Sequence, residues 1–272
     1  MTTRKAELRN FPYVNVPRIK DVEKLLQTQK VSDTYFSRGS GEATKELNHV
    51  EATHRHWVSS MIDLSDFPYC YYTHGVTDAI HHWVLTEDRK WQLPDGEYEY
   101  ANMVGGKGTK VLDQPLYLSN PAAADGNIIY SHTQSPVILD CTYVSSTAIK
   151  TINVPERTEQ VFFSFSKGFG LIGQRLGLVY TKEPHPTLHR LKEYENWNYG
   201  GVRTMQLIMN NFSVDSMYNK YRKKQLDICK EYEFTPSDVF YLATTKDRYY
   251  TRRRRVGDVA RICLTSLFED ML

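Results

Sequence analysis

SFSKGFGLIGQRLG, at residues 164–177, places one lysine, Lys167, between two serines and a glycine-rich turn. The amine of a lysine can form an imine with an aldehyde. The hydroxyls of Ser164 and Ser166 and the guanidinium of Arg175 are donors that suit a phosphate. The stretch therefore predicts a site for a small molecule that carries both an aldehyde and a phosphate.

The overall composition is that of an ordinary soluble globular protein. Of the 272 residues, 40% are hydrophobic and 24% are charged, and this length allows one or two domains. The net charge of +2 predicts no nucleic-acid partner and no membrane partner. The N-terminus lacks the apolar stretch of a signal peptide, and no apolar run is long enough to span a membrane. The four cysteines include no C-x-x-C pair, so we expect reduced thiols, no metal and a cytoplasmic location.

Short apolar strands alternate with a helical pattern in the middle of the chain. After Gly75, residues 76–86 have apolar side chains at helical spacing. Strands are expected at residues 67–73, 116–119, 136–140, 160–164 and 175–180. Because these strands end on polar residues, the pattern predicts a parallel α/β sheet with ligands beyond the carboxyl ends of its strands.

The C-terminal part is predicted to be helical first and then to form strands. Residues 202–233 have the apolar spacing of one or two core-packing helices. Strands at residues 238–244 and 259–265 flank a charged turn, in which Arg252–Arg255 is expected to be a solvated hairpin tip.

Three regions are predicted along the chain. Residues 1–44 form a segment that packs with the small domain and with a dimer partner, and its first thirty residues or so are expected to lie against the C-terminal strands. Residues 45–230 form the large domain, and residues 231–272 form a reduced C-terminal small domain.

Two polar turns lie at the ends of predicted strands. Asp140 and Tyr143 form an Asp-x-x-Tyr pair, although a buried acid at a strand end is often only satisfied by backbone amides. Asn120 begins an Asn-Pro turn, which by itself is only a turn signal.

A third turn, Gly75-Val76-Thr77, joins a strand to a helix. Backbone N–H groups at the start of a helix, with a glycine that allows close approach, can bind a phosphate. Turns of this kind are common, so this one carries weight only together with the others.

In this order along most of the chain, the segments resemble those of fold-type I pyridoxal phosphate (PLP) enzymes, the aminotransferase superfamily. The resemblance implies a three-layer α/β/α large domain with a mainly parallel sheet, and a minimal α+β small domain. It implies that Lys167 binds PLP as an imine, that Asp140 keeps the pyridine nitrogen protonated, and that Tyr143 and Asn120 meet the 3-oxygen of the ring. The phosphate-binding set implied by the resemblance is Gly75, Val76, Thr77, Ser164, Ser166 and Arg175.

The resemblance also implies contacts at the ring face, at the substrate and between subunits. Tyr98 is the candidate for stacking on the pyridine, with Tyr100 as the alternative, or both pack elsewhere. Arg261 is the candidate for binding the substrate α-carboxylate through its planar guanidinium, and the alternative is an arginine on the exposed face of a strand. In the expected homodimer, Tyr35 either reaches the phosphate of the partner subunit or is an ordinary packed aromatic.

The implied activity is that of a PLP-dependent aminotransferase, which moves an amino group between an amino acid and a keto acid. Two alternatives stay open: a PLP-dependent lyase, cyclase or decarboxylase that acts on an amino acid, and a PLP-fold binding protein without turnover. The region from Tyr221 to Arg261 is shorter than in typical members of the family, which puts the closure of the small domain over the substrate in doubt.

Overall fold

The computed structural model describes residue 8 and residues 17–28, 41–105, 113–250 and 255–268. Some predictions concern residues outside these ranges. These include the contact of Tyr35 with the partner's phosphate and, for residues 252–254, the solvated hairpin tip.

A five-stranded sheet, in the order β1-β5-β4-β3-β2, forms the middle layer of the described structure. Its strands are β1 (Tyr69–Thr73), β2 (Leu116–Ser119), β3 (Val137–Asp140), β4 (Thr158–Ser164) and β5 (Gly177–Thr181). The pairs β2–β3 and β3–β4 are parallel, whereas β5 is antiparallel to both of its neighbours, β4 and β1. Strands β1 to β4 therefore point the same way, and β5 points against them.

The reversed direction of β5 is the one departure from parallel pairing in a sheet that was predicted to be mainly parallel. A parallel connection needs a crossover, usually through a helix on one face of the sheet. Residues 165–176 instead form a loop with only the short 3-10 helix Ile172–Gln174, so the chain turns back beside β4. The sheet is mixed and mainly parallel.

Alternation along the strands divides the core between the two faces of the sheet. Tyr71, Phe162 and Val179 belong to the smaller of two buried clusters. Their chain neighbours Tyr72 and Phe163 belong to the larger cluster on the other face. Each strand is thus apolar on both faces, as expected for a sheet that helices cover on both sides.

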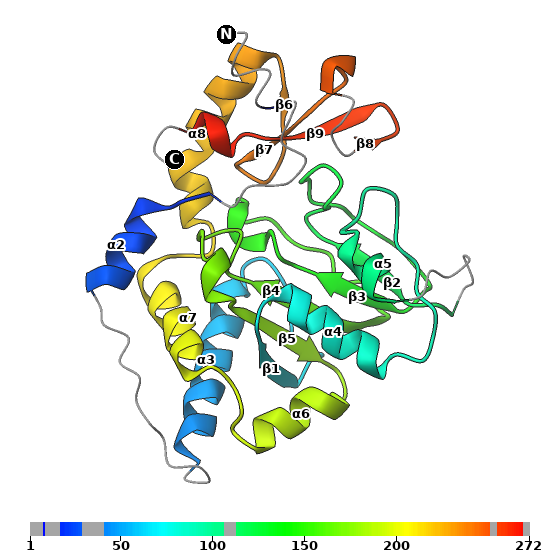
Figure 1. Cartoon of the computed structure of the whole chain (residues 1–272), viewed down its shortest axis with the longest axis vertical. Helices are drawn as coiled ribbons and strands as arrows, with labels where there is room; N and C mark the ends of the chain where they lie inside the picture. Colours follow the sequence, from blue (N-terminus) through cyan, green and yellow to red (C-terminus); the bar gives the residue numbers. More distant parts are fainter. Residues whose placement is uncertain (1–7, 9–16, 29–40, 106–112, 251–254, 269–272) are drawn as a thin grey trace.

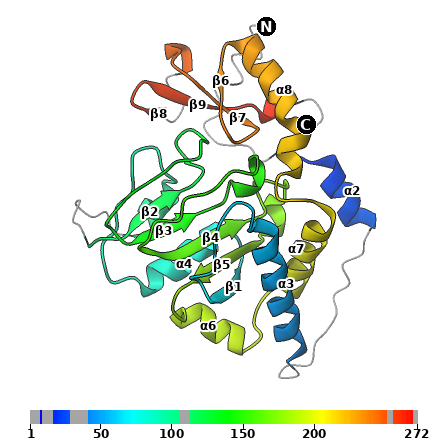
Figure 2. The same ribbon diagram turned by 180° about the vertical axis from the view of Figure 1, so that it is seen from behind.

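Helices form the two outer layers (Figures 1 and 2). One face is covered by α4 (Val76–Thr86), α5 (Tyr100–Val104) and α6 (Pro186–Glu193). The other is covered by α3 (Glu42–Val58) and α7 (Tyr199–Asn211). The bounds of α4 agree with the sequence prediction, and the apolar face that it buries consists of Val76, Ala79, Ile80 and Trp83.

A second sheet lies beyond one edge of the large sheet (Figure 1). Its order is β6-β7-β9-β8, and all of its pairs are antiparallel. Its strands are β6 (Thr235–Pro236), β7 (Leu242–Thr245), β8 (Arg255–Val256) and β9 (Val259–Cys263). Helix α8 (Ser216–Tyr232) leads into it, and α2 (Lys20–Thr28) is joined to α8 by an ion pair between Asp21 and Lys220.

One local expectation in this region is corrected. The strand predicted at residues 238–244 begins only at Leu242, because the backbone N–H groups of Val239 and Phe240 bond to Gly126 and Ser146 of the large domain instead of a neighbouring strand. Most of the N-terminal segment lies outside the described residues, so its packing with the C-terminal strands stays a prediction.

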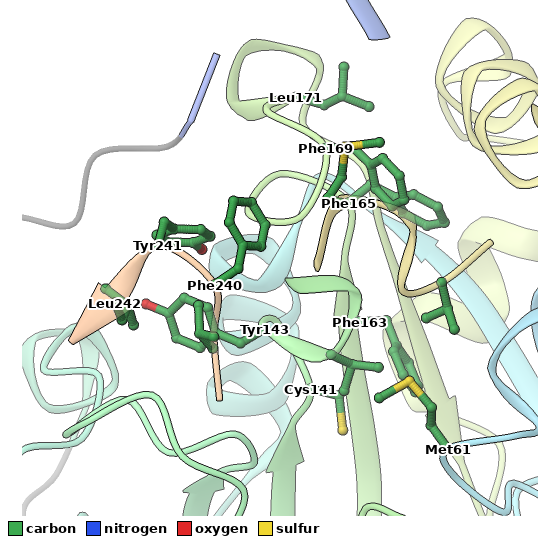
Figure 3. Packing of buried hydrophobic residues seen from close by; sticks show 14 of the residues in the cluster. Met61, Cys141, Tyr143, Phe163, Phe165, Phe169, Leu171, Phe240, Tyr241 and Leu242 are labelled. Atoms are coloured by element: carbon green, nitrogen blue, oxygen red, sulfur yellow. The ribbon is translucent and has the colours of Figure 1, made fainter. Parts of the chain in front are cut away.

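The two sheets share one apolar cluster (Figure 3). Phe165 and Phe169 lie side by side with ring centroids 6.3 Å apart. The ring centroid of Tyr143, in the large domain, lies 6.4 Å from that of Tyr241, which is beside the small sheet. The small sheet is therefore held over the large one by packing as well as by its covalent connections.

Candidate active site

The carboxyl edge, defined here as the edge at which β1 to β4 end, gathers the predicted site residues. Gly75 follows β1, Asn120 follows β2, Asp140 ends β3 and Ser164 ends β4. Because β5 runs in the opposite direction, its N-terminal end lies at the same edge. Arg175 comes just before this strand. One edge of one sheet thus brings together five turns that are far apart in the sequence.

The turn at Gly75 forms a cradle at the start of α4. Gly75 has φ 80°, and a Cβ added there would lie 3.2 Å from Nη2 of Arg175, so glycine leaves room in front of the guanidinium. Arg175 itself has left-handed backbone dihedrals, and the hydroxyl of Tyr72 donates a hydrogen bond of 3.0 Å to its carbonyl oxygen. The first N–H groups of a helix have no partner within the helix, so this cradle suits an anion.

The predicted hydroxyls around the cradle differ in burial and in hydrogen bonding. Ser164 and Ser166 are both buried, and Ser164 Oγ accepts a 3.2 Å bond from the N–H of Ser166. Thr77, in the first turn of α4, is partly exposed.

Lys167 lies in the loop after β4 and is partly buried. The next residue, Gly168, touches Ser145, and a Cβ at this position would collide with it. Burial lowers the pKa of the Lys167 amine; the positive charge of Arg261 lowers it further, and the Asp140 carboxylate raises it. A lysine with a lowered pKa is more often neutral, which is the form that attacks a carbonyl.

Asp140 accepts three hydrogen bonds at this edge. Its Oδ1 accepts bonds from the backbone N–H of Thr142 at 2.8 Å and from the Thr142 hydroxyl at 2.5 Å. Its Oδ2 accepts a 2.5 Å bond from the hydroxyl of Tyr117. Two carboxylate oxygens offer about four acceptor positions. One position on Oδ2 therefore remains for a further N–H donor.

Burial and hydrogen bonding act in opposite directions on Asp140. Burial raises the pKa of its carboxyl group, and this is the largest effect. The donors on Thr142 and Tyr117 lower that pKa, as does the nearby charge of Lys167. The hydrogen bonds and the charge of Lys167 thus favour the carboxylate form, and burial opposes it.

A second buried acid, Glu97, supports the neighbouring turns. It accepts bonds from the N–H and the hydroxyl of Ser119, at 2.9 and 2.5 Å, and from the N–H of Tyr98 at 2.8 Å. Burial raises its pKa, and the charge of Asp140 adds to that effect. Glu97 thereby ties the turn before Tyr98 to the strand end before Asn120.

Asn120 and Tyr143 are buried at the same edge. The side-chain amide of Asn120 both donates to the carbonyl of Ile129, at 3.0 Å, and accepts from its N–H, at 3.1 Å. One N–H of the amide remains for a ligand, since an amide has two. Tyr143 is buried, and Arg261 and Asp140 are close enough to shift its pKa, which burial raises.

The two outer candidates lie at the rim. Tyr98 is 37% exposed and stacks with Tyr100 at a centroid distance of 6.0 Å. Arg261, on β9, donates a hydrogen bond to the carbonyl of Ala123, in the loop after Asn120. The small sheet thus presents an arginine to the carboxyl edge.

The donors and acceptors present fit PLP. An amine, an anion cradle and a buried carboxylate with a free acceptor position match its aldehyde, its phosphate and its protonated ring nitrogen.

The described residues contain no group of three or more His, Cys, Asp or Glu side chains that could hold a metal, and no described helix is both long and apolar enough to cross a membrane.

Three residues of this network were missed in the sequence. Tyr117 and Glu97 gave no signal, because a tyrosine in a strand reads as core and a buried glutamate is rare. Thr142 could have been found, since Asp-x-Thr is a common pattern in which an aspartate accepts from the backbone two residues on.

Comparison with solved structures identifies the fold. An aminotransferase from Staphylococcus aureus matches with a TM-score of 0.61 and 12% identity, over 96% of this chain and 89% of the other. L-threonine-O-3-phosphate decarboxylase from Porphyromonas gingivalis matches with a TM-score of 0.63 and 15% identity, over 94% and 97%. The PLP-bound C-S lyase from Staphylococcus hominis matches with a TM-score of 0.67 and 11% identity, over 94% and 86%.

These structures are PLP-dependent aminotransferases and related fold-type I enzymes, and the chain has their fold. The predicted fold class is confirmed. No family model matches the sequence, and no curated protein matches it.

Proposed function

We propose that this protein is a PLP-dependent enzyme that acts on amino acids, and that its reaction is an amino-group transfer to a keto acid. The observation that carries the proposal is the meeting of Lys167, Asp140 and the Gly75–Arg175 cradle at the carboxyl edge. The shared fold supports it.

The chain's own residues have distinct tasks in this proposal. Gly75, the N-terminus of α4 and Arg175 hold the phosphate, and Asp140 holds the proton on the ring nitrogen. When bound, PLP supplies an electron sink for negative charge at the substrate Cα. The amine of Lys167, with its pKa lowered by burial, moves the proton at that carbon. Arg261 orients the substrate carboxylate from the small sheet.

Attachment of the cofactor is tested by reduction. Protein loaded with PLP and treated with borohydride should carry the label on the peptide that contains Lys167. Lys167→Ala should carry none and should turn over about a thousandfold more slowly, because it lacks the proton-transfer group. Lys182→Ala is the matched control: this lysine bonds to the carbonyl of Glu156, away from the site, so its label and its rate should not change. A label on a different lysine, or no label, contradicts the proposal.

The reaction type is tested with a panel of amino acids and no keto acid. An aminotransferase should release a keto acid in an amount equal to the protein and leave pyridoxamine phosphate. Release of carbon dioxide or of a side-chain fragment would instead indicate a decarboxylase or a lyase, activities that the names of two of the similar structures include. Binding of PLP without any change in the amino acid would indicate a protein without turnover.

A homodimer with shared sites is part of the proposal. Support comes from the frequency of symmetric dimers among homo-oligomers. A cytoplasmic location is proposed from the four cysteines, all of which are free and buried. Light scattering of the PLP-loaded protein tests the dimer, and an active monomer would contradict it.

A further inference from the structure

A buried tyrosine on the strand next to Asp140 is not explained by core packing alone. Tyr117 lies on β2, which pairs with β3 in parallel register so that Ser119 is opposite Asp140. Tyr117 is therefore diagonal to Asp140, within reach of a long side chain on the same face of the sheet. Its ring packs in the cluster under α4, with its centroid 6.0 Å from that of the Trp83 ring. Its hydroxyl donates a hydrogen bond to the Asp140 carboxylate.

The electrostatic environment of Asp140 indicates what the Tyr117–Asp140 bond does. A carboxylate opposite a pyridine nitrogen is useful only if the shared proton stays on the nitrogen, because a protonated ring withdraws electrons more strongly. Burial favours the neutral acid, and the negative charge of Glu97 lies nearby. Both effects would draw the proton toward Asp140.

We propose that Tyr117, together with Thr142, is a positioning residue that keeps the proton on the cofactor's ring nitrogen by stabilising Asp140 as a carboxylate. This inference rests on the proposed function. The bonds of 2.5 Å from the Tyr117 hydroxyl and of 2.5 and 2.8 Å from Thr142 are to a charged acceptor, and such bonds are stronger than neutral ones.

Tyr117 can act as a donor over the whole working range of pH. Burial raises the pKa of its phenol well above the usual value, and the charge of Asp140 raises it further. The bond is therefore not switched off by ionisation of the tyrosine. The other titratable groups around Asp140 are Glu97, Lys167, Tyr143 and Cys141.

The direct test is the state of the ring nitrogen in Tyr117→Phe. Protein is loaded with PLP that carries ¹⁵N in the ring, and the nitrogen resonance is recorded. We expect the resonance of a protonated pyridine in the wild type and a shift toward the unprotonated value in Tyr117→Phe. We also expect turnover at saturating amino acid to fall about tenfold, the typical effect of losing one bond to a charged group.

Two further variants separate tuning from packing. Thr142→Val should move the resonance in the same direction, and Thr142→Ser, which keeps the hydroxyl, should restore it. Tyr71→Phe is the matched control: Tyr71 is buried in the same cluster, but its hydroxyl contacts His185 and His189, so the resonance should not move. Should Tyr117→Phe fail to fold, the Thr142 pair still decides the question.

The outcomes distinguish this inference from the proposed function. A wild type that binds no PLP would overturn both. A wild type that binds PLP and turns over, with an unchanged nitrogen resonance in Tyr117→Phe and Thr142→Val, would overturn the tuning role alone.

Discussion

Two buried polar regions of this protein differ in what burial does to them. At the carboxyl edge, burial works against the ionised forms of Asp140 and Lys167, raising one pKa and lowering the other. Between α3 and the sheet, His54 Nδ1 and the hydroxyl of Tyr180 form a 2.9 Å hydrogen bond, and burial lowers the pKa of His54 to about 3. Both members of the His54–Tyr180 pair are neutral and satisfy each other. Burial thus opposes the charged forms of two groups at the proposed active site, whereas the buried pair on the other face of the sheet is neutral.

Asp140→Asn gives the largest effect that this comparison predicts. Turnover should fall a hundredfold to a thousandfold, because the amide does not hold a proton on the ring nitrogen. The cofactor-free variant should nevertheless be about 1 kcal/mol more stable, since a buried acid that is costly to ionise is gone. Kinetics and urea unfolding at neutral pH measure the two effects, with the exposed Asp66→Asn as the control.

The pH dependence of that gain has a defined sign. The pKa of Asp140 is higher in the folded than in the unfolded protein. As the pH rises through the interval between these two pKa values, the unfolded chain releases a proton that the folded protein still holds, so this group makes the protein less stable. The advantage of Asp140→Asn should therefore appear above the interval and vanish below it. A variant that is equally active, or less stable at every pH, would place Asp140 with the structural groups.

Arg261→Ala is expected to have the next largest effect. Loss of the guanidinium should raise KM for amino acids about tenfold to a hundredfold, the range expected for one or two charge-assisted bonds. The variant also removes the bond to Ala123, so its unfolding must be measured beside its kinetics. Arg89→Ala, which removes two ion pairs, one with Glu87 and one with Glu159, is the control. An unchanged KM with a lower stability would mean that Arg261 only links the small sheet to the large domain.

His54→Leu should leave turnover within about twofold and still lower the free energy of unfolding. The expected loss is about 1–3 kcal/mol, because the buried hydroxyl of Tyr180 loses its bond with His54 and keeps only the weaker bond with the Cys70 thiol. The combined variant His54→Leu/Tyr180→Phe should lose less than the sum of the two single variants. An additive result would show that the two side chains are not coupled.

The same pair predicts how acid acts on the wild type. His54 is neutral in both states above its ordinary pKa of 6.5, and its folded pKa is about 3. As the pH falls from 6.5 toward 3, the unfolded chain takes up a proton that the folded protein does not, so stability falls. His54→Leu should lack this part of the acid destabilisation, and a wild type without it would indicate that His54 is accessible to protons.

Local chemistry in the sequence was enough to find the residues that lie at the carboxyl edge. Lys167 and Arg175 flank a glycine-rich loop, and Gly75 precedes a helix whose bounds the apolar spacing predicted. These signals depend on neighbours within one turn or one loop, where chain geometry leaves few choices. The roles of the individual residues, and the division at residues 44 and 230, stay predictions.

Contacts between distant segments decided the rest. The direction of β5 depends on the path of the loop from residue 165 to 176, and the late start of β7 depends on bonds from Val239 and Phe240 to the large domain. Tyr117 and Glu97 read as ordinary strand and loop residues until the parallel pairing of β2 with β3 brings Ser119 opposite Asp140. The sequence by itself predicted which side chains are candidates for the chemistry, from their types, their local spacing and the resemblance to fold-type I PLP enzymes. Only the tertiary structure decided which of them are buried together and so have altered pKa values, because desolvation and hydrogen bonding arise from residues that are remote along the chain.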